Sequence, residues 1–368
     1  MVRLIAIVAA CALAQFASTL SAATPALLEL KVEKKTFLGK VVAKNDRMCW
    51  LMSQDGALHR IQTDKVSSFR EVSPQFRSWS TTAVRDQLRR ELGTGFEVAG
   101  TRHYIACAAT AQKARDYAEI LENTYRAFHT YFSVRGFKIS EPEFPLIAII
   151  FPDRAAFTKY AQAEKVAVNS TLKGYYLSAS NRVALFESAS TTPASARQAI
   201  SGSIEASLQD TLVHEATHQV AFNVGLHTRV GTNPRWVVEG LATVFEAPGI
   251  RNSNASQSAS SRINPDRLVW FGNFNKNRRK AKSLESFIAD DEMFISASLD
   301  AYSQAWALSF FLIETRPGPY AKYLKSIAQR DPLRNYGPEE RVADFKKAFG
   351  DNLPLLEAEF LRFISGVR

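Results

Sequence analysis

The chain has 368 residues, of which 46% are hydrophobic, and carries 46 lysines and arginines against 36 aspartates and glutamates. This composition is typical of a folded protein of two or three domains and excludes a disordered chain. The net charge of +10 would suit an anionic cell-envelope surface or an acidic substrate. The basic residues are dispersed and form no recognition module, so we expect no nucleic-acid partner.

The first 23 residues have the pattern of a secretory signal peptide. Arg3 supplies the positive charge, an apolar stretch follows from residue 4, and small residues end at Ala23, where we expect cleavage. Cys11 stands in a short lipobox-like run, so lipidation is an alternative. No later apolar run approaches the roughly 20 residues of a membrane helix. We therefore expect a secreted or periplasmic, cell-envelope protein without a transmembrane segment in its mature chain.

Residues 24–75 are predicted to form a small β-barrel domain of the SH3 type. Apolar and polar residues alternate there, and Asp55-Gly56 marks a hairpin turn. Residues 76–94, with a charged helix at 82–92, are predicted to be a linker. The expected strands are 28–32, 37–43, 49–52, 58–61 and 66–69.

Residues 95–368 are predicted to form one domain that combines a mixed sheet with mainly helices, which makes the fold class α+β. The strand at 144–151 is fully apolar, and an amphipathic helix spans 111–132. Further strands are expected at 96–98, 103–107, 172–177 and 182–186, and further helices at 154–163, 208–224, 234–245 and from about residue 284 to the end.

The most informative motif is H-E-x-x-H at His214, Glu215 and His218, inside the predicted helix 208–224. Histidines four residues apart share one helical face and can hold one metal ion between them. The glutamate beside the first histidine then lies where it can act on a water at the open metal position. Zinc hydrolases need this arrangement. The spacing therefore predicts a Zn²⁺ centre with Glu215 as general base.

A catalytic zinc ion usually takes a third protein ligand. Glu239, 21 residues beyond His218 on the next predicted helix, is our candidate. Glu246 lies on the same helical face and is expected to orient a ligand histidine without contacting the metal itself, with Thr243 as the other candidate for this role. His227 does not fit the H-x-x-G-x-x-H spacing of metzincins, so we expect an ordinary loop residue there.

These residues resemble the gluzincin zinc metallopeptidases, a family that includes thermolysin-like and aminopeptidase N-like catalytic domains. The similarity is carried by H-E-A-T-H at 214–218 and by W-V-V-E-G-L-A-T-V-F-E at 236–246. The resemblance implies zinc bound by His214, His218 and Glu239. It also implies a tyrosine that stabilises the oxyanion, and Tyr302 stands at the matching distance.

One departure limits the resemblance. Aminopeptidases of that branch carry G-x-M-E-N on the edge strand, and residues 174–187 lack it. Asn181, Arg182 and Val183 are expected on that edge strand, where an extended substrate would pair. The chain is therefore more similar to uncharacterised secreted bacterial gluzincin-like proteins, and aminopeptidase against endopeptidase action stays open.

Two functions follow from these patterns. The first is a secreted zinc-dependent peptidase acting on peptide or protein substrates. The alternative is a non-catalytic envelope-binding protein whose zinc site is structural and whose barrel recognises the partner. Of the remaining cysteines, Cys49 and Cys107 lie in apolar runs, which favours two buried thiols and leaves a disulfide between them open.

Overall fold

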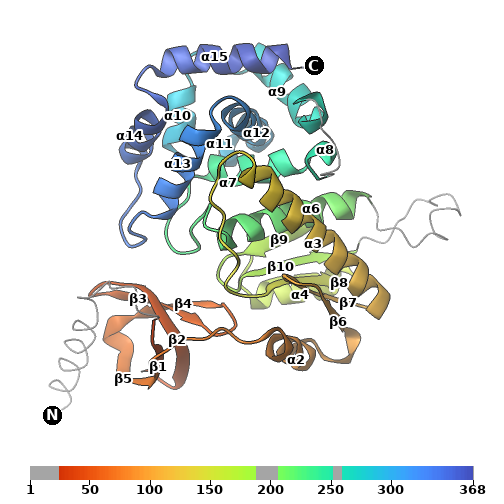
Figure 1. Ribbon diagram of the computed structural model, residues 1–368, viewed down its shortest axis with the longest axis vertical. Coiled ribbons are helices and arrows are strands. Elements are labelled where there is room, and N and C mark those ends of the chain that lie inside the picture. Colours follow the sequence, from red (N-terminus) through yellow and green to blue (C-terminus); the bar gives the residue numbers. More distant parts are fainter. Residues whose placement is uncertain (1–24, 188–205, 252–258, 368) are drawn as a thin grey trace, which may run out of the picture.

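The computed structural model describes residues 25–187, 206–251 and 259–367, which form two β-sheets and a layer of helices (Figure 1). The predicted signal peptide, with Cys11 and the cleavage site at Ala23, lies outside the described residues. None of the described helices is long and apolar enough to cross a membrane. The chain is thus a mixture of helices and strands, as the sequence predicts.

The N-terminal sheet has five antiparallel strands in the order β4-β3-β2-β1-β5. Short turns connect neighbours along the chain, and the Asp55-Gly56 turn joins β3 to β4. Gly56 has a φ of 86°, which glycine adopts without steric cost. The strands are β1 (Leu27–Val32), β2 (Lys35–Lys44), β3 (Met48–Ser53), β4 (Leu58–Gln62) and β5 (Val66–Ser73).

The predicted barrel is not closed. β4 and β5 are the two edges of the sheet and do not pair with each other. The pairing of β2 with β3 shifts register between Val41 and Ala43, and such irregularities bend a sheet. The sheet covers a core that includes Leu30, Leu51 and Ile61. Alternating apolar residues predict which face is buried, but they do not determine whether the edge strands meet.

The second sheet is mixed, in the order β6-β7-β8-β10-β9. β7, β8 and β10 run parallel, whereas β6 and β9 are antiparallel edge strands. The predicted edge strand was wrong, because β10 lies inside the sheet and β9 forms the edge. The strands are β6 (Glu97–Gly100), β7 (Tyr104–Ala108), β8 (Leu146–Phe151), β9 (Gly174–Leu177) and β10 (Arg182–Phe186).

Helices cover both faces of this sheet. Helices α3 (Ala111–Ser133) and α6 (Ala206–Asn223) bury their apolar stripes on one face. Helices α2 (Thr81–Leu92) and α4 (Arg154–Ala163) pack on the other. Asp153 caps α4 through the backbone N–H of Ala156, as expected of an Asp just before a helix. β8 is buried along its whole length, because it lies at the centre of this three-layer arrangement.

The segment predicted as a linker contributes to this core. α2 places Val84 and Leu88 against the second sheet. The N-terminal sheet is then held to the rest of the molecule by polar contacts at its β3–β4 turn. Arg229 donates hydrogen bonds to the carbonyl oxygens of Gly56 (2.6 Å) and Ser178 (2.7 Å), and the Leu58 N–H donates to Ala179.

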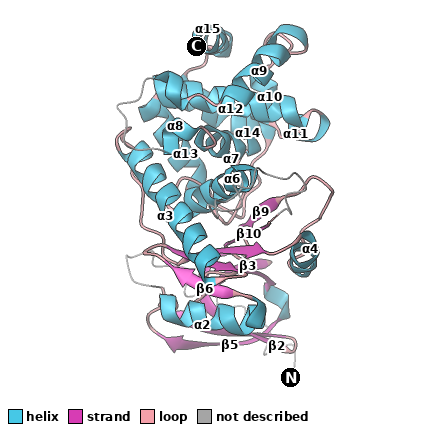
Figure 2. Ribbon diagram, turned by 90° about the vertical axis from the view of Figure 1, so that its right-hand side faces the viewer, coloured by secondary structure: helices cyan, strands magenta, loops and turns pink. Residues whose placement is uncertain are grey.

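The C-terminal part is helical and occupies the upper half of the molecule in Figure 2. Its central helix is α12, in which Tyr302 is the one residue between 300 and 313 that is not buried. The helices are α7 (Arg235–Phe245), α8 (Pro248–Arg251), α9 (Pro265–Asn277), α10 (Leu284–Ala289), α11 (Met293–Ser296), α12 (Ser298–Thr315), α13 (Pro317–Ala328), α14 (Pro338–Phe349) and α15 (Leu353–Gly366).

The two cysteines of the described chain are free and buried in different cores. Cys49 lies in the N-terminal sheet and Cys107 in β7 of the second sheet. Burial raises the pKa of Cys49 to about 11 and that of Cys107 to about 12, so both thiols stay protonated at neutral pH. The sequence left their pairing open, and the structure keeps them apart.

Candidate metal centre

Helix α6 carries the H-E-x-x-H motif across the face of the second sheet. Leu212, Ala216 and Val220 are fully buried in the core beneath it. Gln219 fixes the helix further, because its side-chain amide donates hydrogen bonds to the carbonyl oxygens of Ile147 (3.0 Å) and Asn181 (2.8 Å). The histidines one turn apart are therefore held on a rigid element.

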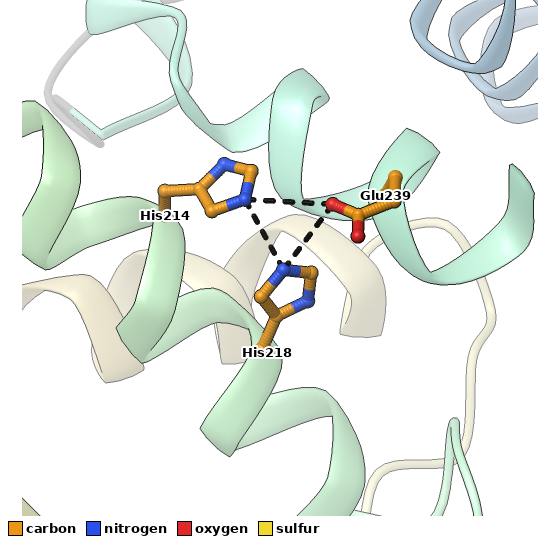
Figure 3. Close-up of side chains that lie close together, drawn as sticks. All are labelled: His214, His218 and Glu239. Atoms are coloured by element: carbon orange, nitrogen blue, oxygen red, sulfur yellow. Dashed lines mark hydrogen bonds and ion pairs between the residues drawn. The ribbon is translucent and has the colours of Figure 1, made fainter. Parts of the chain in front are cut away.

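His214, His218 and Glu239 converge, with Glu239 arriving from α7 (Figure 3). The two Nε2 atoms of the histidines are 3.1 Å apart. Glu239 Oε2 lies 3.6 Å from Nε2 of His214 and 3.5 Å from that of His218. One carboxylate oxygen thus faces both imidazole nitrogens.

This triangle fits a zinc ion. Ligand atoms about 2.0–2.2 Å from a tetrahedral zinc ion lie roughly 3.4 Å from one another, close to the three observed separations. Glu239 Oε2 is buried and has no hydrogen-bond partner among the described residues. Its contacts with the two histidine nitrogens, at 3.5 and 3.6 Å, are longer than normal hydrogen bonds, and a cation between the three atoms would compensate the buried charge. Two imidazoles and one carboxylate are also a ligand set that zinc accepts.

Glu246 contacts the outer nitrogen of the first histidine. Its Oε1 lies 3.0 Å from Nδ1 of His214. Asn264 donates a 2.7 Å hydrogen bond to the other carboxylate oxygen, and Arg267 donates to both. A carboxylate that accepts from Nδ1–H fixes the ring so that the Nε2 lone pair points at a metal. The structure thus brings Glu246 into contact with one of the histidines that the sequence predicts as ligands.

Glu246→Gln should weaken zinc binding by about 10- to 100-fold, which is the usual cost of removing an outer-shell partner. The amide oxygen can still accept from His214 but no longer carries the charge. Competition with a chelating dye measures the affinity. Glu119→Gln, the same change at an exposed position on α3, should leave the affinity unchanged. Equal zinc affinity for the Glu246 variant and the wild-type protein would show that this contact does not support the ligand.

The charges in the site oppose the effect of burial. Burial disfavours the ionised forms of His214 and Glu239. The contacts of His214 with Glu239 and Glu246, and the charge of Glu215, nevertheless raise the pKa of His214 to about 10. The two histidines hold the pKa of Glu239 well below its usual range. Burial also opposes ionisation of Glu246, yet His214 and Arg267 lower its pKa to about 2. A metal ion bound here would replace the proton on His214.

Glu215 is half-buried and follows His214 on α6. Within the described part of the chain, no hydrogen bond or ion pair ties its carboxylate to another residue. Its negative charge raises the pKa of both His214 and Tyr302, so it acts on the same site as these two residues. A carboxylate left free beside the ligand cluster is available to a water molecule.

Tyr302 projects from α12 toward the same region. Arg235 connects it to the cluster, with one guanidinium nitrogen 3.5 Å from the Tyr302 hydroxyl and another 3.7 Å from Glu239 Oε1. Burial and the charge of Glu239 raise the pKa of Tyr302 to about 12, although Arg235 opposes this. The hydroxyl therefore keeps its proton at neutral pH and can donate a hydrogen bond.

Two other residues singled out in the sequence do not contact the ligand side chains. The Thr243 hydroxyl lies 2.7 Å from the carbonyl oxygen of Glu239, so it bonds the backbone of α7 and not a ligand atom. Threonine hydroxyls commonly make this bond inside helices. His227 lies in the loop after α6, as predicted, and is outside the ligand cluster.

Gly240, next to Glu239, sets the spacing between α7 and α12. A Cβ atom at this position would lie 2.6 Å from the Ala305 carbonyl oxygen and 2.1 Å from Ser309 Oγ. Gly240→Ala should therefore destabilise the protein by about 1–3 kcal/mol, because the backbone of α12 must move. Chemical unfolding measures this. Gly272→Ala on α9, where a Cβ meets nothing within 4 Å, is the control and should not destabilise. Equal stability of the two variants would contradict this account.

The sequence did not reveal Arg235, Asn264 or Arg267 as parts of this site. Arg235 could have been predicted, because it precedes Glu239 by four residues and therefore lies on the same helical face. Asn264 and Arg267 begin α9, which is distant in sequence and reaches Glu246 only through the packing of the helical layer. No local pattern marks such residues.

Residues 209–334 match a family described as "protein of unknown function (DUF1570)". The matched segment contains the histidines, Glu215, Glu239, Glu246 and Tyr302. No curated protein matches the chain. The similarity therefore covers the site, and the description of the family names no activity.

Proposed function

We propose that this protein is a secreted, zinc-dependent peptidase of gluzincin type. The observation that carries the proposal is the His214–His218–Glu239 cluster with the free carboxylate of Glu215 beside it. A structural zinc site is usually closed by four protein ligands, whereas a catalytic site keeps one position open. The described part of the chain offers three ligands and an adjacent base, which favours a catalytic site.

The chain's own residues have distinct tasks in this proposal. When bound, zinc supplies Lewis acidity, which polarises a carbonyl oxygen and lowers the pKa of a coordinated water toward about 7. Glu215 accepts the proton of the attacking water and passes it to the leaving amine. Glu246 holds His214 in one tautomer by accepting from its Nδ1–H.

Tyr302 and Arg235 are placed to act on the developing negative charge. The raised pKa of Tyr302 keeps its hydroxyl protonated, so it can donate to the oxyanion of a tetrahedral intermediate. Arg235 lies against this hydroxyl and against Glu239. The guanidinium therefore orients the tyrosine and compensates the charge of the ligand carboxylate.

The edge strand β9 is suited to hold an extended peptide. Its partner β10 occupies one side, which leaves the other row of backbone N–H and C=O groups without a strand among the described residues. α6 packs against this strand: a Cβ atom at Gly174 would meet the side chain of Thr211. A substrate paired along β9 would then run beside the helix that carries the ligands.

The proposal is tested by turnover of a peptide library. We expect cleavage by the purified full chain, its loss on treatment with a chelator, and its return when zinc is added. A protein that binds zinc tightly but cleaves no member of the library would instead support the alternative of an envelope-binding protein with a structural zinc site. Cleavage that persists with all metal removed would contradict the mechanism.

A further inference from the structure

A pocket of about 860 Å³ lies beyond the C-terminal end of α6. Val42 and Met52 of the N-terminal sheet line one part of it. The loop after α6, the segment 136–140 and helix α13 line the rest. The pocket thus lies where the N-terminal sheet meets the helical layer, and no residue of the metal cluster lines it.

The pocket carries a strong positive charge. Among the described residues, its lining includes Lys138, Arg229, Lys322, Lys325 and Arg330 and contains no acidic side chain. Asp344 and Glu340 bind Arg330, and Arg229 donates to main-chain carbonyl oxygens. Within residues 25–187, 206–251 and 259–367, the three lysines form no ion pair. Their charge is therefore available to an anionic ligand.

His227 adds a buried polar group to the same pocket. Its side chain is almost completely buried, and the residue is 3% exposed. Nδ1 lies 3.0 Å from the carbonyl oxygen of Leu226, so this nitrogen carries the proton and donates it. Nε2 is then an acceptor, and it has no partner among the described residues. Burial lowers the pKa of His227 to about 3, so the ring is neutral and Nε2 can accept from an N–H or O–H group.

The pocket begins close to the candidate metal centre. Phe222, which lines it, lies one helical turn after His218 on α6. The Phe222 ring contacts His227, with centroids 5.1 Å apart, and Tyr176 of the edge strand β9, at 5.4 Å. A chain that follows β9 past the metal ligands would therefore arrive at His227.

We propose that this pocket binds the carboxylate-bearing part of a peptide substrate, a few residues from the bond at the metal. A peptide N–H donates to Nε2 of His227, and a side-chain or C-terminal carboxylate accepts from Lys322 and Lys325. The inference rests on the proposed peptidase function, because it makes the pocket a continuation of the substrate path. If the pocket has this role, the substrates of the proposed peptidase are acidic peptides.

Binding is measured separately from cleavage. Fluorescein-labelled peptides of alternating alanine and glutamate are compared with alanine–glutamine counterparts, each with a free or an amidated C-terminus. Fluorescence anisotropy on the zinc-loaded Glu215→Gln protein gives the affinities. We expect the glutamate peptides to bind about tenfold or more tightly than the glutamine peptides, since hydrogen bonds to charged groups are the strong ones. A preference that depends on the free C-terminus instead would assign the terminal carboxylate as the bound group.

Substitution of the lysines tests the site itself. Lys322→Gln with Lys325→Gln should remove most of this preference and leave the affinity for the amidated glutamine peptide unchanged. Lys276→Gln with Lys280→Gln removes the same charge from exposed positions outside the pocket and should have no effect. His227→Leu should weaken both peptides, because it removes the shared acceptor.

Three results would overturn the proposal: equal affinity for acidic and neutral peptides, an equal loss in the control variant, or tighter binding of a single-stranded oligonucleotide than of the acidic peptide. The failure of the peptidase function has a different signature. In that case the zinc-loaded wild-type protein cleaves neither neutral nor acidic peptides, whatever the binding measurements give.

Discussion

Glu215→Gln should lower the rate of peptide hydrolysis by about 1,000-fold, within the range that a general base contributes. Glutamine keeps the shape of the side chain but cannot accept a proton from the attacking water. The ligand set of His214, His218 and Glu239 is unaltered, so zinc should bind with its original stoichiometry. Steady-state kinetics and metal analysis of the same preparation measure both properties.

The matched control is Glu119→Gln, which makes the same chemical change on the exposed side of α3 and should retain full activity. A Glu215 variant that cleaves peptides at the original rate would exclude the base assigned here. A variant that loses zinc together with activity would show instead that Glu215 supports the metal centre.

Glu239→Gln is expected to weaken zinc binding by more than about 100-fold, a larger effect than the loss of an outer-shell partner. The carboxylate supplies the only negative charge in the ligand triangle, and its buried Oε2 faces both histidines. A neutral amide oxygen is a poor replacement in a buried site, so activity should fall in parallel and recover only at high zinc concentration.

Equilibrium competition with a chelating dye, followed by activity measured against added zinc, distinguishes this result from unfolding. A properly folded variant gives the wild-type circular dichroism spectrum. Wild-type zinc affinity in such a variant would mean that Glu239 is not a ligand. If Glu246→Gln and Glu239→Gln weakened zinc binding equally, the measurement would not separate a metal ligand from a residue that only orients one.

Local spacing predicted the part of the site that lies on one helix. His214 and His218 are one turn apart, so their shared face follows from helical geometry alone. Glu239 was predicted as the third ligand because a catalytic zinc ion usually takes one and because this carboxylate lies on the next predicted helix. The contact of its carboxylate with both Nε2 atoms depends on the packing of α6 against α7, which no sequence pattern specifies.

In the fold, too, local patterns predicted individual elements but not how those elements are arranged. Apolar runs located most strands and helices, including the fully buried β8. They did not identify β9 as the edge of the second sheet, because strand order is set by crossover connections and not by the residues of one strand. They also suggested a closed barrel, although only the pairing of β4 with β5 would close it. Similarly, Val84 and Leu88 look like isolated apolar residues in a charged helix until their place beneath the second sheet is known.

The ligands of the candidate metal centre belong to different layers of the molecule. His214 and His218 stand on the helix that packs on the second sheet, whereas Glu239 stands on a helix locked to α12 through Gly240. A bound ion would therefore cross-link the sheet layer and the helical layer. Ligand linkage would then stabilise the native state by about 4 kcal/mol at a metal concentration 1,000 times the dissociation constant. A folded protein that binds the ion would therefore be more resistant to unfolding when the metal concentration is high than when it is low.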